Sequence, residues 1–119
     1  MNMFFQRVVL GIGPVGSLIR FHVHDSPDYL ANVLLVRGNT TVGTWESTEA
    51  VGKTCEEPLD VAGFYNLQIT VTFIAATPTD FTVDMTLERP DGTQTSETVT
   101  FPGGVLDDMG RVVADFLIQ

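Results

Sequence analysis

The sequence predicts an all-β protein that folds as a two-sheet antiparallel β-sandwich of about eight strands. Its 119 residues include 15 Val and 15 Thr but only 6 Ala and a single Lys, a composition that favours strands over helices. Apolar and polar residues alternate in several segments, and turn residues recur roughly every eight to twelve positions. A chain of this length is expected to form one domain, residues 1–119.

Four strands are expected in the first half of the chain, over residues 4–10, 17–24, 31–37 and 42–46. Gly38 and Asn39 supply a turn between the third and fourth of them. Residues 47–53 are expected to form a loop or a short helix.

Four more strands are expected in the second half, over residues 67–75, 81–88, 94–101 and 111–118. The clearest alternation places Leu67, Ile69, Val71 and Phe73 on one face of a strand. Residues 89–93, with Pro followed by Asp and Gly, predict a hairpin turn that closes with a bulge. A helical turn is an option for residues 106–109.

The segment around Asp60, Gly63 and Tyr65 resembles the corner of immunoglobulin-like sandwiches, in which a tyrosine leads into a core strand. This resemblance covers about eight residues and implies that the tyrosine hydroxyl bonds back to nearby backbone. It supports an immunoglobulin-like or jelly-roll-like sandwich and assigns these three residues an architectural role.

The charge balance excludes several classes of partner. Fifteen acidic and six basic residues give a net charge of −9, so a nucleic-acid interface and an anionic membrane surface are not expected. No apolar run is long enough to span a bilayer, and glycines and Pro14 interrupt the one stretch that has the outline of a signal peptide. We therefore expect a soluble protein in the cytoplasm or in an assembled particle. The single cysteine, Cys55, is expected to be a buried apolar residue.

His22 and His24 are the strongest local signal for a metal site. A spacing of two places both imidazoles on one face of a strand, as metal ligands require. Gly16, five further residues and His-x-His resemble the opening of the cupin metal motif, and this resemblance implies a bound transition metal. Asp28 is the best candidate for a carboxylate ligand, although an exposed histidine pair without a metal explains the pattern more simply.

Acidic residues at the expected strand ends suggest a second kind of site. Loops that converge at one end of a sandwich can offer carboxylates to Ca²⁺, and the candidates are Asp25, Asp60, Asp80 and Asp107. Trp45 and Tyr29 are candidates for stacking on a sugar ring, with the core as the alternative place for Trp45. Asp in turns also caps local backbone, which explains these positions without calcium.

Three functions follow from these observations. The first is a non-enzymatic structural protein that assembles through sheet edges or faces into a homo-oligomer or larger particle, such as a virion, a phage tail or a surface layer. The second is a lectin-like module that binds calcium and a glycan. The third is a small cupin-like protein that uses a metal at the histidine pair. Because the sequence holds no hydrolase or phosphate-binding motif, an enzyme is not expected, and the absence of any bound cofactor is the simplest expectation.

Overall fold

The computed structural model describes residues 3–75, 79–103 and 109–119 and is almost entirely β-structure. The described elements, in chain order, are β1 (Met3–Gly13), β2 (Ser17–Val23), β3 (Tyr29–Arg37), β4 (Thr40–Trp45), α1 (Ser47–Ala50), β5 (Thr54–Leu59), β6 (Gly63–Phe73), β7 (Phe81–Glu88), β8 (Gln94–Phe101) and β9 (Met109–Ile118). The prediction of an all-β sandwich is confirmed. No helix in these described ranges has the length and apolar character needed to cross a membrane.

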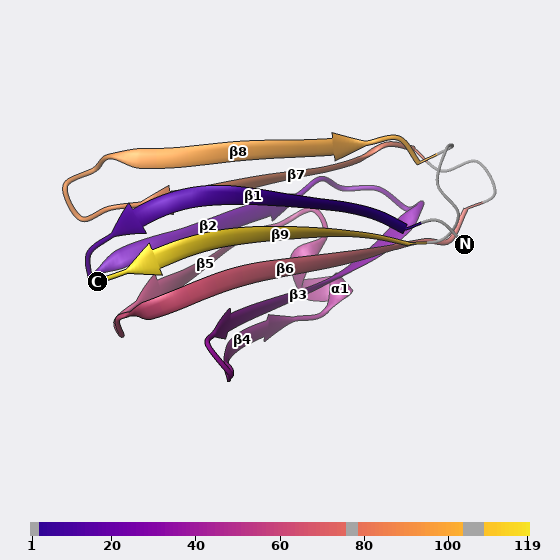
Figure 1. Cartoon of the computed structure of the whole chain (residues 1–119). Helices are drawn as coiled ribbons and strands as arrows, with labels where there is room; N and C mark the ends of the chain where they lie inside the picture. Colours follow the sequence, from indigo (N-terminus) through magenta and orange to yellow (C-terminus); the bar gives the residue numbers. More distant parts are fainter. Residues whose placement is uncertain (1–2, 76–78, 104–108) are drawn as a thin grey trace.

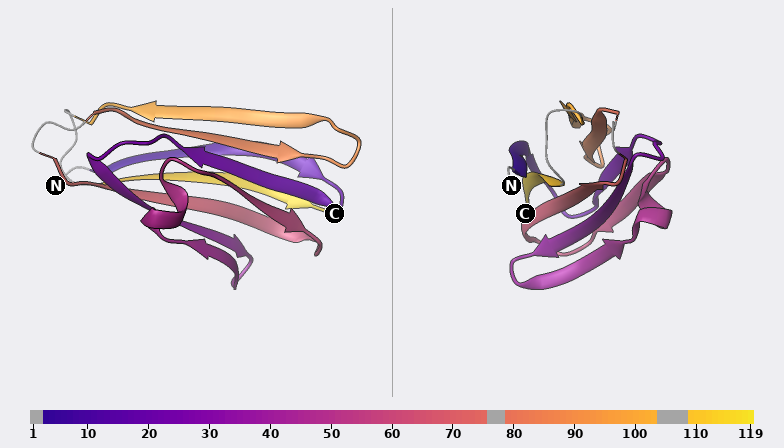
Figure 2. Two further views of the ribbon diagram at one scale, coloured as in Figure 1. Left: turned by 180° about the vertical axis from the view of Figure 1, so that it is seen from behind. Right: turned by 90° about the vertical axis from the view of Figure 1, so that its right-hand side faces the viewer.

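The strands form two layers (Figures 1 and 2). One sheet has five strands in the order β1-β9-β6-β3-β4, and the other has four in the order β5-β2-β7-β8. All pairs are antiparallel except β1 with β9, which run parallel. The antiparallel prediction is therefore wrong for this one pair, because the first and last strands of the chain enter the same sheet in the same direction.

The core lies between the two sheets and is built from the inward residue of every second position. On β6, for example, Leu67, Ile69 and Val71 are each fully buried, as the alternation predicts. Aromatic rings fill one end of the core, where Phe81 lies 4.8 Å from Phe101 and 5.1 Å from Tyr29 between ring centroids. The inner faces are consumed by this packing, so any contact with another molecule uses the outer faces, the edges or the ends.

A bulge in β1 sets which of its side chains face outward. Val9 pairs with Asp115 and Gly11 with Phe116, so Leu10 is the extra residue, and its side chain is buried in the core. Gly11 has φ +91°, a conformation that residues with a side chain rarely adopt. After the bulge the alternation resumes with Ile12 on the outer face.

The outer edge of β1 is covered by the other sheet. Phe4 stacks on Phe101 with ring centroids 4.2 Å apart, and Nε of Arg89 donates to the carbonyl of Ile12 at 2.8 Å. Figure 1 shows β8 running beside β1 at this side of the sandwich. Because its edge groups are covered in this way, β1 offers little free backbone to a further strand.

The corner at the start of β6 has the expected hydrogen bond. The hydroxyl of Tyr65 donates to the carbonyl of Val61 at 2.5 Å, and its ring stacks on Phe116 at 5.3 Å. Gly63 has φ +155° and faces the stem of Arg37, where a Cβ atom would lie 2.8 Å from Cδ. Asp60 is exposed on the loop that precedes them.

Two elements differ from the sequence expectation. β5 was not expected, because its Pro58 and its run of acidic residues are unusual in a strand, and it lies at the edge of the four-stranded sheet, where such residues are tolerated. Residues 47–50 are the short helix α1, one of the two expected alternatives. The helical turn suggested for residues 106–109 lies outside the described residues except for Met109, which begins β9.

Candidate functional site

The outer surface of the five-stranded sheet, which we call the five-stranded face, is the most distinctive surface of the molecule. Strand register places its side chains in rows that cross neighbouring strands. The rows, each given in the order β1, β9, β6 and then β3 where that strand takes part, are Ile12, Leu117 and Phe64; Val9, Asp115, Asn66 and Val36; Arg7, Val113, Gln68 and Leu34; and Phe5, Arg111, Thr70 and Asn32. These residues come from distant parts of the chain, so no single sequence motif contains them.

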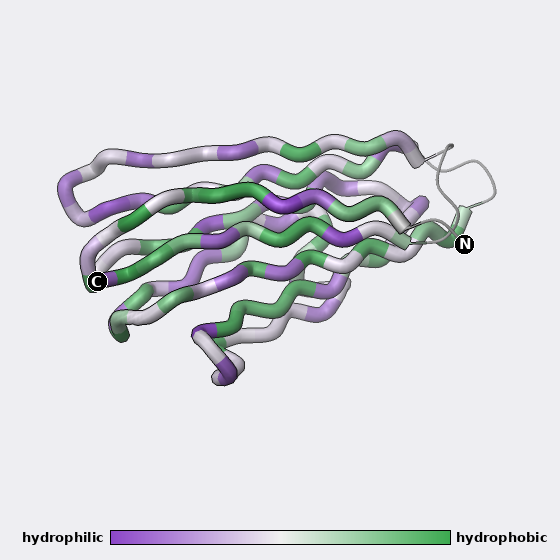
Figure 3. Tube along the Cα trace, viewed as in Figure 1, coloured by the Kyte–Doolittle hydropathy of each residue, from purple (hydrophilic) through white to green (hydrophobic). Residues whose placement is uncertain are grey.

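Large apolar side chains are exposed on this face. The exposed fractions are 50% for Phe5, 66% for Val9, 53% for Ile12 and 55% for Phe64. With Leu117, the last three line a hollow of about 370 Å³ beside Asp115. Figure 3 shows hydrophobic residues recurring along both β1 and β9. Contiguous exposed apolar surface of this kind marks sites of contact with other molecules.

Asp115 is a buried charge in the middle of the five-stranded face. The residue is only 7% exposed, although its side chain points away from the core. Its Oδ2 atom lies 3.2 Å from a terminal nitrogen of Arg7. Its Oδ1 atom is buried and has no hydrogen-bond partner among the described residues. A buried carboxylate oxygen without a donor is energetically costly and rare in native proteins.

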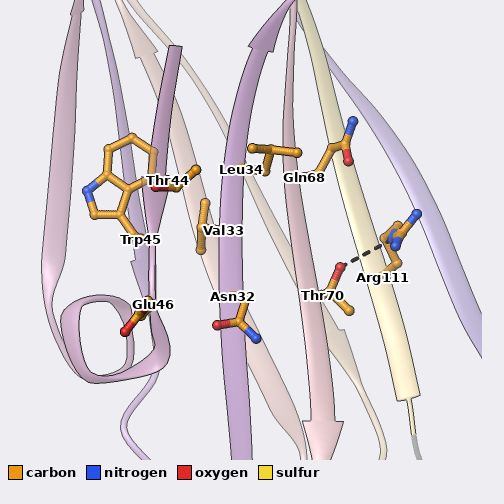
Figure 4. Close-up of a pocket in the computed structure, with 9 residues that line it drawn as sticks. All are labelled: Asn32, Val33, Leu34, Thr44, Trp45, Glu46, Gln68, Thr70 and Arg111. Atoms are coloured by element: carbon orange, nitrogen blue, oxygen red, sulfur yellow. Dashed lines mark hydrogen bonds between the residues drawn. The ribbon is translucent and has the colours of Figure 1, made fainter. Parts of the chain in front are cut away.

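A polar hollow of about 330 Å³ adjoins the apolar part of the same face (Figure 4). Its wall includes Asn32 from β3, Gln68 and Thr70 from β6, and Arg111 from β9. Nε of Arg111 donates to the hydroxyl of Thr70 at 3.3 Å, which holds the arginine stem along the sheet. These amide, hydroxyl and guanidinium groups can form hydrogen bonds across an interface, and the guanidinium adds positive charge.

The outer surface of the other sheet, the four-stranded face, has the opposite character. Its outward side chains are bonded to one another across the strands: Thr86 lies 2.8 Å from Ser96 between hydroxyl oxygens, and Arg20 lies within 3.6 Å of carboxylate oxygens of both Glu56 and Glu88. Figure 3 shows β8 largely in the hydrophilic and neutral colours. This face is polar and satisfies many of its own hydrogen bonds.

His22 and His24 lie side by side on the four-stranded face, with ring centroids 5.4 Å apart. His24 Nε2 lies 2.9 Å from a carboxylate oxygen of Asp84, and His22 Nδ1 lies 3.4 Å from the hydroxyl of Thr54. The Thr98 hydroxyl, which donates to Asp84 at 2.7 Å, and the neighbouring His24 hold the pKa of Asp84 below its usual range, against the opposing effect of partial burial. The pair is thus part of the polar network on this face.

The carboxylates expected to complete a metal or calcium site are dispersed. Asp28 accepts the backbone N–H of Thr79 at 2.8 Å, a loop-capping role. Asp25 and Asp80 line a hollow with His24 at the end of β2, whereas Asp60 lies beyond the other end of that strand, and Asp107 is outside the described residues. Within residues 3–75, 79–103 and 109–119, no group of three or more His, Cys, Asp or Glu is placed to hold a metal ion.

The two aromatic residues considered as sugar platforms belong to the interior. Tyr29 is 2% exposed and donates its hydroxyl to the carbonyl of His24 at 2.5 Å, so its ring has no free face for a ligand. Trp45 is partly buried and packs edge-on against Phe21 with centroids 5.0 Å apart. The stacking role expected of Tyr29 is therefore wrong, and Trp45 contributes to the core, the alternative that the sequence also suggested.

Cys55 is buried on β5, as expected, and is free. Its thiol lies 3.4 Å from the carbonyl of Glu49, and burial, together with the charge of Glu49, raises the pKa of the thiol. A raised pKa disfavours the nucleophilic thiolate.

The sequence reasoning missed the residues of the five-stranded face. Residues 111–118 were expected to form a strand, and the outward positions Arg111 and Asp115 on it already showed two charges in an otherwise apolar segment. That signal distinguishes the outer side of β9, but it does not reveal that Val9 and Phe64 lie next to it. Comparison of the chain with models of known protein families, with curated proteins and with solved structures finds no match.

Proposed function

We propose that this protein is a structural subunit that assembles with copies of itself through the five-stranded face. One observation carries the proposal: Phe5, Val9, Ile12 and Phe64, each at least half exposed, share this face. Burying large apolar side chains is the main favourable contribution to association. A component of a virion, a phage tail or a surface layer is the class of protein that this description fits.

A face is favoured over the sheet edges because the edges carry features that oppose strand addition. On β8, Glu97 pairs with Met85 and points toward the inner side of the sheet, which places a charge where a docking strand would bury it. On β5, Pro58 removes a backbone donor from the edge. β1 is covered by Arg89 and Phe101.

A second copy is favoured as the partner by the distribution of charge. At a net charge of −9, two copies repel each other wherever acidic surfaces approach. The rows of the five-stranded face contain one acidic residue, Asp115, against two basic residues, Arg7 and Arg111. This is a surface on which two acidic molecules can meet without bringing their negative charges together.

The size of the molecule is compatible with such an interface. Each partner in a stable complex buries about 800 Å². The principal extents of the chain are 44 × 25 × 21 Å, so its broad face accommodates a contact of that area. Apolar residues surrounded by amide, hydroxyl and guanidinium groups also match the usual arrangement of an apolar centre with a polar rim.

The test is the mass of the protein in solution, measured by light scattering over a range of concentrations. The wild type is expected to give a multiple of 13.0 kDa, whereas Val9→Lys and Phe64→Lys are expected to shift the distribution toward 13.0 kDa. Thr86→Lys, on the four-stranded face, is the matched control and is expected to assemble as the wild type does. A wild type that stays at 13.0 kDa up to about 100 μM, or a control that loses assembly as fully as the test variants, contradicts the proposal.

A further inference from the structure

We infer that two copies meet about a two-fold axis that crosses β9 at Val113, so that Arg111 of each copy binds Asp115 of the other. This inference rests on the proposed function, because it specifies the contact at the centre of the same face. It assigns a role to the two charged side chains of β9 that point outward, and it defines the relative orientation of the subunits.

The first step is the unmet requirement of Asp115. Its side chain is 10% exposed, Arg7 contacts Oδ2, and Oδ1 is buried without a partner among the described residues. A donor supplied by a second molecule would satisfy that oxygen, and a guanidinium suits a carboxylate best because its N–H groups form a planar fork. Asp115 is therefore a receptor for a cationic side chain.

The surroundings of Asp115 fit an arginine in particular. The hollow beside it is lined by Val9, Ile12, Phe64 and Leu117, so that an incoming side chain meets apolar surface before it reaches the carboxylate. An arginine carries a methylene stem that packs on apolar surface while its guanidinium binds an oxygen. The aromatic ring of Phe64 adds a surface to which a cation is attracted.

The second step is the spacing of charges along β9. Arg111 and Asp115 point outward at equal distances on either side of Val113, about 6.7 Å from it along the strand. If a second copy faces the first with its β9 antiparallel, Arg111 of each chain lies opposite Asp115 of the other. Two sheets pack face to face with their strands within about 30° of each other, so this alignment is an ordinary one. An isologous contact repeats the charge pair twice.

The rows that flank β9 are complementary under the same operation. The row of Arg111 faces the row of Asp115, which brings Phe5 of one copy opposite Val9 of the other. It also brings Thr70 opposite Asn66. Apolar groups meet apolar groups and polar groups meet polar groups, and Val113 meets its own copy at the axis.

Charge reversal tests the pairing. Arg111→Asp and Asp115→Arg each place like charges opposite one another twice, so each variant alone is expected to raise the dissociation constant by about tenfold or more. Mixed in equal amounts, the two variants restore both pairs in a heterodimer, and the double variant R111D/D115R restores them in a homodimer. Both samples are expected to recover association to within about threefold of the wild type. Sedimentation of labelled chains measures these constants, and circular dichroism checks each fold.

Arg20→Asp is the matched control, because it changes the net charge by the same amount on the four-stranded face, where Arg20 pairs with Glu56. It is expected to leave the dissociation constant close to the wild-type value. If Asp115→Arg fails to fold, Arg111→Gln and Asp115→Asn replace the reversal, and their effects on association are expected to be non-additive in the double variant.

The outcomes separate the two proposals. A wild type that assembles, together with an Arg111→Asp variant that assembles equally well, overturns the charge pair and leaves the five-stranded face as the interface. A mixture that associates no better than either variant alone also overturns the pairing. A wild type that remains a monomer overturns both the proposed function and this inference.

Discussion

At the scale of single residues, the two tyrosines are as important for the fold as the apolar core. Both are buried, and both donate their hydroxyls to backbone carbonyls, Tyr29 to His24 and Tyr65 to Val61. Each bond ties a loop to a core strand and removes a buried polar group from the list of unsatisfied atoms. The rings themselves pack on Phe81 and Phe116.

Removing the Tyr65 hydroxyl is expected to loosen the corner without disturbing the core. Tyr65→Phe keeps the ring that stacks on Phe116 but loses the bond to Val61, at a cost of about 1 kcal/mol in the free energy of unfolding. Urea denaturation measures this change. Thr86→Val, which removes an exposed hydroxyl from the four-stranded face, is the control and should change the stability by less than about 0.5 kcal/mol. Equal stability of Tyr65→Phe and the wild type would show that the corner bond contributes nothing.

Tyr29 predicts a loss of stability at high pH. Burial, with smaller contributions from the charges of Asp25 and Asp28, raises the pKa of Tyr29 from 10.0 to about 12. Because the folded state favours the protonated phenol, its contribution is complete below pH 10 and is lost as the pH rises toward 12. The stability difference between the wild type and Tyr29→Phe, measured by urea denaturation from pH 9 to 12, should therefore shrink. A difference that stays constant over this range contradicts the assignment.

At the scale of elements, local pattern was enough to predict most strands. Alternation predicted β6 and β7 and the residues that they bury, because one side of each packs on the core. It missed β5, where Pro58 interrupts the pattern, and it ended β1 before the bulge at Leu10. The parallel pairing of β1 with β9 depends on contacts between the two ends of the chain, which no local pattern contains.

The candidate site was hidden for the same reason. His22 and His24 are adjacent in sequence and were easily found, yet they belong to a polar network on the four-stranded face. Val9, Phe64 and Asp115 become neighbours only when three strands assemble in the observed register. A sequence can show that a residue points outward, but strand order decides which outward residues share a surface.

The edge strand β8 provides a prediction at the scale of elements. Glu97→Val replaces the inward-pointing charge with a residue that favours strands, so the variant should retain its fold but aggregate more readily through β8. Turbidity at high protein concentration measures this effect. Ser96→Val, on the same strand but facing outward, is the matched control. Equal aggregation of the two variants would mean that Glu97 does not protect this edge.

At the scale of the whole molecule, the two outer faces have different roles. The four-stranded face bonds to itself and carries acidic residues, whereas the five-stranded face carries the exposed apolar residues and the unpartnered oxygen of Asp115. The acidic surface keeps copies apart in other orientations. The molecule is thus built to associate in few ways, which an ordered assembly requires.

Assembly should strengthen with ionic strength. Raising the salt concentration shortens the Debye length from about 14 Å at 0.05 M to about 4 Å at 0.5 M and screens the repulsion between two chains of charge −9. The desolvated pair of Arg111 and Asp115 is screened much less, and apolar burial is unaffected. Sedimentation at both salt concentrations should show a severalfold lower dissociation constant at the higher one. Weaker association in high salt would mean that exposed charge pairs hold the copies together.

The most direct measurement of the central claim is covalent footprinting of apolar side chains, read by mass spectrometry, in dilute and concentrated solutions of the wild type. Val9 and Phe64, which are 66% and 55% exposed in the single chain, should lose labelling as copies associate. Val15, 47% exposed in the turn between β1 and β2, should keep its labelling. Unchanged labelling of Val9 and Phe64 in a sample that has assembled would place the interface elsewhere and contradict the account.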